Sequence, residues 1–280
     1  MPEHLPDEPG PSPESFGGLY KLLTASATYR RIMTEVFGES LALQLSIVAP
    51  ADVRLLAARA GLEAGQRVAD FCCGLGGPTL LIAAEYGCQV FAVDWSSQAT
   101  ASCWRSAVAA GLQDTVRPVV ADISRPPFAE GSLDAIVSID GFYFGVDLPA
   151  LYARVFRLLR PGGYFAFYFD VPSQAVVEAS SPTRRAHRES HRIDHLAVLA
   201  GAGFINARAE DRTAAQTLHL GRMLTSYKTH FQRLRAEIGP QLAIDLRDEI
   251  SQTLQMTQQG LWPRYLFSAR KPDDRPARRR

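Results

Sequence analysis

The chain has 280 residues, of which 46% are hydrophobic and 21% are charged, and these values exclude a wholly disordered chain, a collagen-like fibre and a disulfide scaffold. Its 30 basic and 29 acidic residues give a net charge of +1, which argues against nucleic acid as the main partner. This length suits one large domain or two small ones.

Targeting and cysteine signals are weak throughout the chain. No apolar run reaches the roughly 18 residues that a membrane span needs, and residues 1–15 lack the basic start and apolar centre of a secretion signal. We therefore expect a cytoplasmic protein with no membrane partner. The four cysteines lack CxxC spacing, so we expect reduced, mostly buried thiols and no metal site.

The predicted elements alternate between helices and strands from an early point in the chain. Residues 1–15 are rich in proline and acidic residues and are expected to be disordered, and residues 16–50 form a helical segment with a helix at 19–36. A further helix is expected at 51–60, at the start of the core. Five short β-branched or aromatic runs then predict strands at 67–72, 89–94, 116–122, 133–140 and 164–170. Helices are expected between them at 78–86, 98–110 and 148–159.

This alternation predicts a doubly wound, Rossmann-like α/β fold with a mostly parallel sheet and helices on both faces. Its ligand site is expected at the carboxyl ends of the strands. Two later strands, at 204–211 and 261–271, complete a core that comprises residues 51–212 and 260–271. Residues 272–280 form a basic tail that we expect to be disordered.

An insertion at residues 213–259 has apolar residues at helical spacing, with a break at Gly239 and Pro240. It is predicted to be a helical hairpin. We expect the hairpin to act as a lid that selects the acceptor molecule; the alternative is that its apolar face forms a homodimer.

The most informative segment runs from Val68 to Ser96. A strand ends at Phe71, a glycine-rich turn leads into a helix near Pro78, and the next strand ends at Asp94. Glycines let a ligand approach the backbone, and a carboxylate at the end of the second strand suits the two hydroxyls of a ribose. Such a turn can also join a strand to a helix without any ligand. The dinucleotide fingerprint GxGxxG is broken by Thr79, which disfavours a nicotinamide cofactor.

The pattern Asp70-x-Cys72-x-Gly74-x-Gly76 resembles motif I of the class I S-adenosylmethionine-dependent methyltransferases, D/E-x-G-x-G-x-G, with cysteine in place of the first glycine. The L-x-P-G-G sequence at 159–163 and the third strand, which ends near Asp122, extend this resemblance over residues 51–269.

The resemblance implies a seven-stranded sheet with an antiparallel last strand and S-adenosyl-L-methionine as the cofactor. It assigns the adenine amino group to Asp122 and the adenine ring to Ile123, and Trp95 is expected to pack on the adenine or to be an ordinary core residue. The Asp70 carboxylate complements the charge at the methionine end of the cofactor. The expected cofactor-binding residues are Asp70, Cys72, Gly74, Gly76, Asp94, Trp95, Asp122 and Ile123.

Candidate residues for acceptor binding lie at the ends of the fourth and fifth strands. Methyl transfer is an in-line displacement, so precise positioning can replace a general base. Asp140 ends the fourth strand and is expected to contact the acceptor together with Tyr143, although Asp140 alternatively caps the following turn. Asp170 ends the fifth strand and is the next carboxylate on the same rim.

Three histidines, His187, His191 and His195, recur every four residues and would form one row if their segment were helical. A near-neutral pKa makes His191 and His195 candidate bases. The alternative is an ordinary solvated helix.

The leading hypothesis is a methyltransferase that acts on a small, partly apolar metabolite, as many enzymes of bacterial secondary metabolism do. A second hypothesis keeps the fold and cofactor but assigns other chemistry, such as cyclisation or decarboxylation. A non-catalytic binding module would be expected to lose the glycine-rich turn and Asp94, and neither is lost. The sequence after the fourth strand, Asp140 to Tyr143, lacks the prolines of DNA amino-methyltransferases, which again disfavours nucleic acid.

Overall fold

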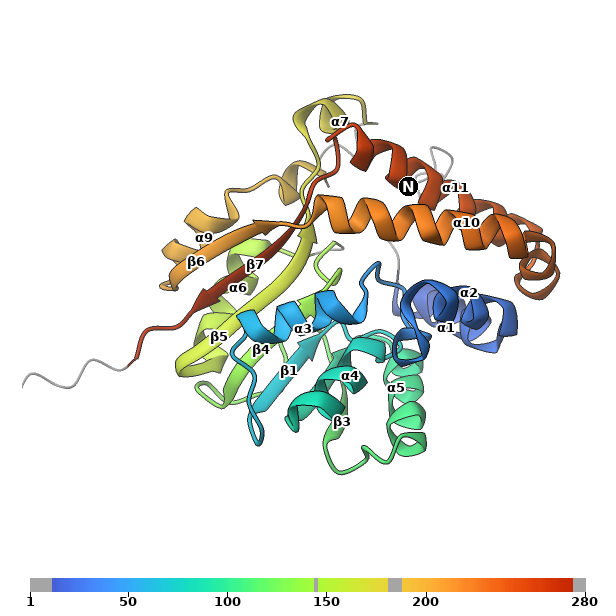
Figure 1. Cartoon of the computed structure of the whole chain (residues 1–280). Coiled ribbons are helices and arrows are strands. Elements are labelled where there is room, and N and C mark those ends of the chain that lie inside the picture. Colours follow the sequence, from blue (N-terminus) through green and yellow to red (C-terminus); the bar gives the residue numbers. More distant parts are fainter. Residues whose placement is uncertain (1–11, 144–145, 181–187, 274–280) are drawn as a thin grey trace, which may run out of the picture.

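The computed structural model describes residues 12–143, 146–180 and 188–273, and a seven-stranded sheet forms its centre (Figure 1). The strand order is β3-β2-β1-β4-β5-β7-β6. Strands β1 to β5 pair in parallel, whereas β7 is antiparallel to both β5 and β6. The predicted fold class is therefore confirmed. The strands are β1 (Arg67–Phe71), β2 (Gln89–Asp94), β3 (Val116–Val120), β4 (Leu133–Ile139), β5 (Leu159–Asp170), β6 (Ile205–Asp211) and β7 (Arg264–Arg270).

Helices cover both faces of the sheet and its carboxyl edge (Figure 1). One face packs against α3 (Pro50–Arg59), α4 (Gly77–Tyr86) and α5 (Ser97–Ala109), and the other packs against α6 (Leu148–Leu158) and α9 (His195–Gly201). The remaining elements are α1 (Pro13–Ala25), α2 (Ala27–Phe37), η1 (Glu39–Leu41), α7 (Gln174–Glu178), α10 (Thr213–Ile238) and α11 (Pro240–Gln258).

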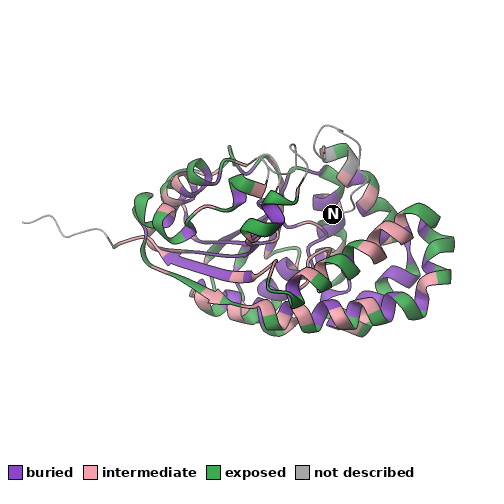
Figure 2. Ribbon diagram, turned by 90° about the horizontal axis from the view of Figure 1, so that it is seen from above, coloured by how far each residue is buried: buried purple, intermediate pink, exposed green. Residues whose placement is uncertain are grey.

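Two apolar cores form because successive side chains of a strand point to opposite faces. On β5, Phe165, Phe167 and Phe169 pack with α6 and α9, while Ala166 and Tyr168 belong to the core under α3, α4 and α10. Figure 2 shows the buried residues along the sheet and on the inward faces of the helices. Burial on both faces explains why these strands have nearly continuous apolar sequences.

The N-terminal segment differs from its prediction as one helix at 19–36. It forms α1 and α2, which are separated at Ser26, because the Ser26 hydroxyl accepts the Tyr29 amide as an N-cap and so begins a new helix. Helix α1 begins at Pro13, inside the segment expected to be disordered. The rest of the predicted tails, residues 1–11 and 274–280, lies outside the described residues.

The insertion forms two helices, α10 and α11, with the break at Gly239, whose φ of 90° favours glycine, and Pro240. Helix α10 passes over the carboxyl ends of the strands and packs against α2 (Figure 1). In the described part of the chain, no helix has the length and apolar character needed to cross a membrane.

Candidate active site

The glycine-rich turn between β1 and α4 packs tightly on α5. Gly74 and Gly76 have φ values of 53° and 89°, which favour glycine. A Cβ atom at Gly76 would lie 2.5 Å from the Cys103 sulfur, closer than any real contact. The second and third glycines of the predicted motif are therefore required by the backbone and by the packing of the turn.

Cys72 occupies the position of the first motif glycine and also has a positive φ, 61°. Its thiol donates to the Gly141 carbonyl oxygen at 3.1 Å. A Cβ at Gly141 would lie 2.6 Å from the Cys72 Cβ, so the absence of a side chain at Gly141 makes room for the thiol. The turn and the end of β4 are thus directly packed through this pair.

The Asp94 carboxylate joins the end of β2 to the glycine-rich turn. One oxygen accepts the Gly74 amide at 3.0 Å and the other accepts the Ser96 amide at 2.9 Å. Burial raises the pKa of Asp94, and these two hydrogen bonds oppose that shift. Because each carboxylate oxygen can accept a second hydrogen bond, both retain capacity for a pair of ligand hydroxyls.

Asp70, at the end of β1, is buried beneath the same turn. Its carboxylate accepts the Thr79 hydroxyl at 2.5 Å. Burial raises the pKa of Asp70 to about 7, the Thr79 hydrogen bond lowers it, and the nearby Asp94 raises it further. In the sequence analysis, Thr79 served only to disfavour a dinucleotide cofactor. The structure shows that its hydroxyl also binds the Asp70 carboxylate, which the sequence did not indicate.

The residues expected to contact adenine follow β2 and β3. Ile123 is buried, and the Asp122 carboxylate accepts the Ser124 amide at 2.7 Å. Trp95 is 36% exposed and its ring lies 6.1 Å from that of Phe16 on α1. Trp95 is thus not an ordinary core residue, and part of its surface remains open to solvent.

Helix α1 covers the glycine-rich turn, which the sequence did not predict. Tyr20 is buried with Leu75 and Ala99 in a small apolar cluster separate from the two main cores. The Tyr20 hydroxyl lies 3.6 Å from where a Cβ of Gly74 would be. Burial, followed by the negative charge of Asp94, raises the pKa of Tyr20, so its hydroxyl stays protonated over the turn.

Asp140 and Asp170 meet at the carboxyl ends of β4 and β5, where Arg264 binds both. Arg264 Nη1 lies 2.8 Å from Asp140 Oδ1 and 3.0 Å from Asp170 Oδ1, and Nη2 donates to Asp140 Oδ2 at 2.9 Å. Gln216 Nε2 and Trp262 Nε1 donate to Asp170 Oδ2 at 2.9 and 3.1 Å. The sequence analysis missed Arg264, although antiparallel pairing of the last strand places it opposite Asp170.

Tyr143 and His191 lie beside this ionic cluster. The Tyr143 hydroxyl accepts the Asp170 amide at 2.9 Å and donates to Asp140 at 3.5 Å. The Tyr143 ring stacks on the Phe169 ring, with 4.9 Å between the ring centroids. It also makes an edge-on contact with the His191 ring, with 5.8 Å between the centroids. The structure therefore brings Asp140, Tyr143 and His191 together.

His195 lies in different surroundings, because the predicted histidine row is not continuous. One helix ends at His191, and Asp194 caps a new helix that begins at His195; His187 lies outside the described residues. His195 Nδ1 is 2.7 Å from the Tyr152 hydroxyl, and its ring packs 4.6 Å from Phe267. Burial lowers the pKa of His195 to about 4, so it is uncharged at neutral pH.

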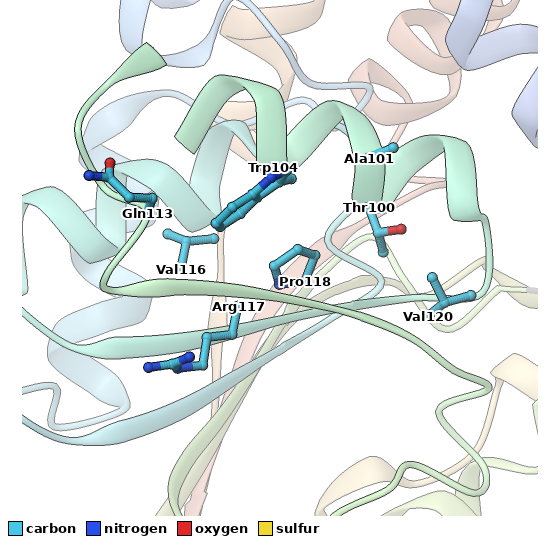
Figure 3. Close-up of a pocket in the computed structure, with 8 residues that line it drawn as sticks. All are labelled: Thr100, Ala101, Trp104, Gln113, Val116, Arg117, Pro118 and Val120. Carbon is cyan, nitrogen blue, oxygen red and sulfur yellow. The ribbon is translucent and has the colours of Figure 1, made fainter. Parts of the chain in front are cut away.

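A surface hollow between α5 and β3 includes none of these residues (Figure 3). It is lined by Trp104, Pro118 and Val120, among others, at the outer edge of the sheet. Among residues 12–143, 146–180 and 188–273, no cluster of three or more His, Cys, Asp or Glu side chains is arranged to hold a metal ion.

Residues 68–163 match the family described as methyltransferase domain. Sterol methyltransferase-like 1 of Botryococcus braunii is 28% identical over 184 residues, which are 66% of this chain and 44% of that relative. The chain therefore spans less than half the length of this curated relative.

Two solved structures share the fold over nearly the whole chain. Phosphoethanolamine N-methyltransferase 2 of Haemonchus contortus, solved with phosphomonomethylethanolamine and S-adenosylhomocysteine, has a TM-score of 0.75 and 22% identity, and the match covers 94% of this chain and 61% of that chain. The [4+2]-cyclase SpnF has a TM-score of 0.73 and 20% identity, with coverage of 95% and 98%. At these identities the two structures establish the fold alone.

Proposed function

We propose that the chain is a class I S-adenosylmethionine-dependent methyltransferase and that it transfers the methyl group of this cofactor to a small, partly apolar acceptor. The observation that carries the proposal is the glycine-rich turn, held by the hydrogen bond from the Gly74 amide to the buried Asp94 carboxylate. Both features suit a nucleoside ligand, and the absence of a glycine at Thr79 disfavours a dinucleotide.

The residues at this end of the sheet fit the cofactor in three parts. Asp94 is assigned to the ribose hydroxyls through the free lone pairs of its two oxygens. Asp122, Ile123 and Trp95 are assigned to the adenine. Asp70 and Cys72 are assigned to the methionine end, where the cofactor, when bound, supplies an electrophilic methyl group on a cationic sulfur.

The acceptor is assigned to the adjacent ends of β4 and β5. Tyr143 and the carboxylates of Asp140 and Asp170 would orient it so that its electron pair forms a bond to the methyl carbon while the carbon–sulfur bond breaks and its electrons return to sulfur. Where the acceptor loses a proton, we assign the base to His191. His195 is the weaker candidate, because its ring is bonded to Tyr152 and its pKa is lowered to about 4 by burial.

The hairpin of α10 and α11 is assigned as the lid over this acceptor. A role in secondary metabolism and a cytoplasmic location are parts of the same proposal and rest on the sequence. The cyclase SpnF, matched over 98% of its length, motivates a second candidate, an enzyme that keeps the cofactor but rearranges its substrate.

Incubation of the full chain with trideuteromethyl-labelled cofactor and fractionated small-molecule extracts would test the proposal. We expect S-adenosylhomocysteine to form together with a product that has gained one labelled methyl group, and we expect much less of both with the Asp94→Ala variant when the cofactor is not saturating. A product of unchanged mass, without S-adenosylhomocysteine, would instead support the cyclase. Failure of the protein to bind S-adenosylhomocysteine in calorimetry would exclude both functions.

A further inference from the structure

Two polar side chains on the inward face of α10 are each fixed at one end by a carboxylate. Gln216 is 1% exposed, and its Nε2 donates to Asp170 Oδ2 at 2.9 Å. His219 is 8% exposed, and its Nε2 lies 2.8 Å from Asp52 Oδ2. Because Gln216 Nε2 donates to Asp170, whose other oxygen binds Arg264, the amide oxygen Oε1 is the free end of the Gln216 side chain.

The same reasoning assigns the proton on His219. Burial alone would raise the pKa of Asp52. Hydrogen bonds from His219, the Ala49 amide and Arg212 outweigh burial and lower this pKa to about 2. Asp52 is therefore anionic at neutral pH, and His219 Nε2 carries the proton that faces it. In the neutral ring this leaves Nδ1 as an unprotonated acceptor.

The free ends of these two side chains are both buried, and in the neutral form of the His219 ring both are acceptors. Neither Gln216 Oε1 nor His219 Nδ1 has a hydrogen-bond partner among the described residues. A buried acceptor without a donor costs free energy, so such atoms call for a ligand or solvent group that donates to them. The two residues are three positions apart and so share one face of the helix.

This face of α10 connects directly to the predicted acceptor site. Asp170 holds Gln216 and is linked through Arg264 to Asp140. The residue after Asp140 is Gly141, which packs on Cys72 in the glycine-rich turn. Further along the same helix, Leu220, Met223 and Tyr227 are buried and mainly apolar. The face thus places Gln216 beside the cluster of Asp140, Arg264 and Asp170, while its apolar residues pack inside the core of the chain.

We propose that Gln216 Oε1 and His219 Nδ1 bind an N–H or O–H group of the methyl acceptor. This inference rests on the proposed function and narrows its substrate class to a partly apolar molecule with a hydroxyl or amino head group. An anionic head group has only lone pairs to present to these two acceptor atoms and no proton to donate to them. Carboxylates and phosphates should therefore be excluded from this position.

Matched probes with one apolar body and different head groups test the proposal. The full chain is saturated with S-adenosylhomocysteine and titrated calorimetrically with 3-phenylpropanol, 3-phenylpropylamine or 3-phenylpropanoate at about pH 7. We expect the alcohol, the amine or both to bind at least about tenfold more tightly than the carboxylate. The difference between the first two identifies the hydroxyl or the amino group. Equal affinities, tighter binding of the carboxylate, or no binding of any probe would overturn the proposal.

A pair of variants on α10 provides a matched control. His219 and His230 are both buried at 8% exposure, and His230 is bonded to Glu35 at 3.0 Å as His219 is to Asp52. His219→Phe should abolish the preference for a donor head group, whereas His230→Phe should keep it. Loss of the preference in both variants, or in neither, would count against a specific role for His219.

A measurement on the unmodified protein remains informative if His219→Phe does not fold. Nitrogen NMR of ¹⁵N-histidine-labelled protein should show His219 with Nδ1 unprotonated and should show a change at that nitrogen when the favoured probe is added. A proton on Nδ1 in the free protein would contradict the proposed hydrogen bond. Binding of S-adenosylhomocysteine without any head-group preference would refute this subsite and leave the proposed function standing, whereas no binding of S-adenosylhomocysteine would overturn both.

Discussion

At the residue scale, Asp94 is the side chain that we propose to bind the ribose of the cofactor. Its carboxylate already accepts two backbone amides and retains lone pairs for two ribose hydroxyls. Two charge-assisted hydrogen bonds contribute roughly 1.5 to 3 kcal/mol each, so Asp94→Ala should weaken cofactor affinity at least about tenfold in calorimetry. Asp122→Ala, which removes one adenine contact, should cause a smaller loss. Unchanged affinity in a folded Asp94→Ala protein would contradict the ribose assignment.

Asp70 predicts how cofactor affinity depends on pH. Burial raises the pKa of its carboxyl to about 7, and the cationic methionine end of the cofactor favours the ionised form. Binding should therefore release a proton below about pH 7, and affinity should increase as the pH rises through that value and then level off. Calorimetry between about pH 6 and pH 8 would measure this, and Asp70→Asn should give a flat profile.

The raised pKa of Asp70 has the opposite effect on the free protein. The unfolded chain ionises this carboxyl near its ordinary pKa of 3.8, whereas the folded protein holds the proton up to about pH 7. Between these values the folded state binds more protons, so the contribution of Asp70 to stability falls as the pH rises. If the affinity for the cofactor instead decreased from pH 6 to pH 8, the ionised Asp70 carboxylate would not be the form that binds the cofactor.

The Cys72 and Gly141 pair predicts a compensating double substitution. Gly141→Ala should destabilise the fold by roughly 1 to 3 kcal/mol, because the new Cβ would lie 2.6 Å from the Cys72 Cβ. Cys72→Gly removes the contacts with Cys72, although Ser138 Oγ would still lie 2.6 Å from the new Cβ. It also relieves a positive φ that costs a non-glycine residue roughly 1 kcal/mol. Urea unfolding should show the double variant more stable than Gly141→Ala alone. Equal stability of these two variants would mean that the close contact is relieved in another way.

At the element scale, α1 covers the glycine-rich turn with Tyr20 and is anchored in the main core by Leu23, which is fully buried. Its buried residue Tyr20 belongs to a small cluster of its own, and Ser26, where α1 meets α2, is held by Glu237 at the end of α10. A segment that covers a bound ligand must move before the ligand can leave. Helix α1 is therefore predicted to control the rate at which the cofactor leaves.

Tyr20→Ala should speed cofactor dissociation by about tenfold, because the ring that covers the turn must move before the cofactor can leave. Association should change less, since affinity differences between variants of one site appear mostly in the dissociation rate. Stopped-flow fluorescence of Trp95, whose ring lies 6.1 Å from Phe16 on α1, would measure both rates. Leu22→Ala is the matched control, since Leu22 is on the same helix but is 46% exposed. Equal dissociation rates for the two variants would show that Tyr20 does not hold the cofactor.

At the scale of the whole molecule, the hairpin of α10 and α11 either closes the acceptor site of its own chain or joins two chains. Its apolar residues Leu220, Tyr227 and Leu234 are fully buried against the N-terminal helices and the core of the same chain. The face on which a homodimer was expected is therefore already covered. This arrangement favours the lid.

Two mild substitutions separate the lid from the dimer. Tyr227→Phe removes a buried hydroxyl that lacks a partner among the described residues, and Phe231→Leu trims a partly buried ring that faces Arg247 at 4.9 Å. We expect at least one of them to change acceptor KM or kcat by about threefold or more while cofactor affinity stays near that of the unmodified protein. Sedimentation should not change. A variant that becomes a monomer and retains its acceptor kinetics would refute the lid.

The sequence by itself determined the sheet, the cofactor turn and the position of its carboxylates, because these depend on local patterns. Apolar strand runs alternate with helical periodicity over the core, and glycines at 74 and 76 are required by backbone conformation within a few residues. Asp94 could be assigned to the turn because a strand–turn–helix–strand unit of this length brings its two ends together. The last strand and Asp122 needed the family resemblance in addition.

Only the tertiary structure decided which side chains meet across distant parts of the chain. Arg264 binds Asp140, 124 residues earlier, and His219 binds Asp52, 167 residues earlier. Local periodicity shows which face of a helix or strand is buried, but a partner depends on strand register and on where α10 and α1 cross the sheet. The same limit explains why His191 and His195, equivalent in a helical pattern, belong to different surroundings: a helix end at His191 and the cap at Asp194 separate them.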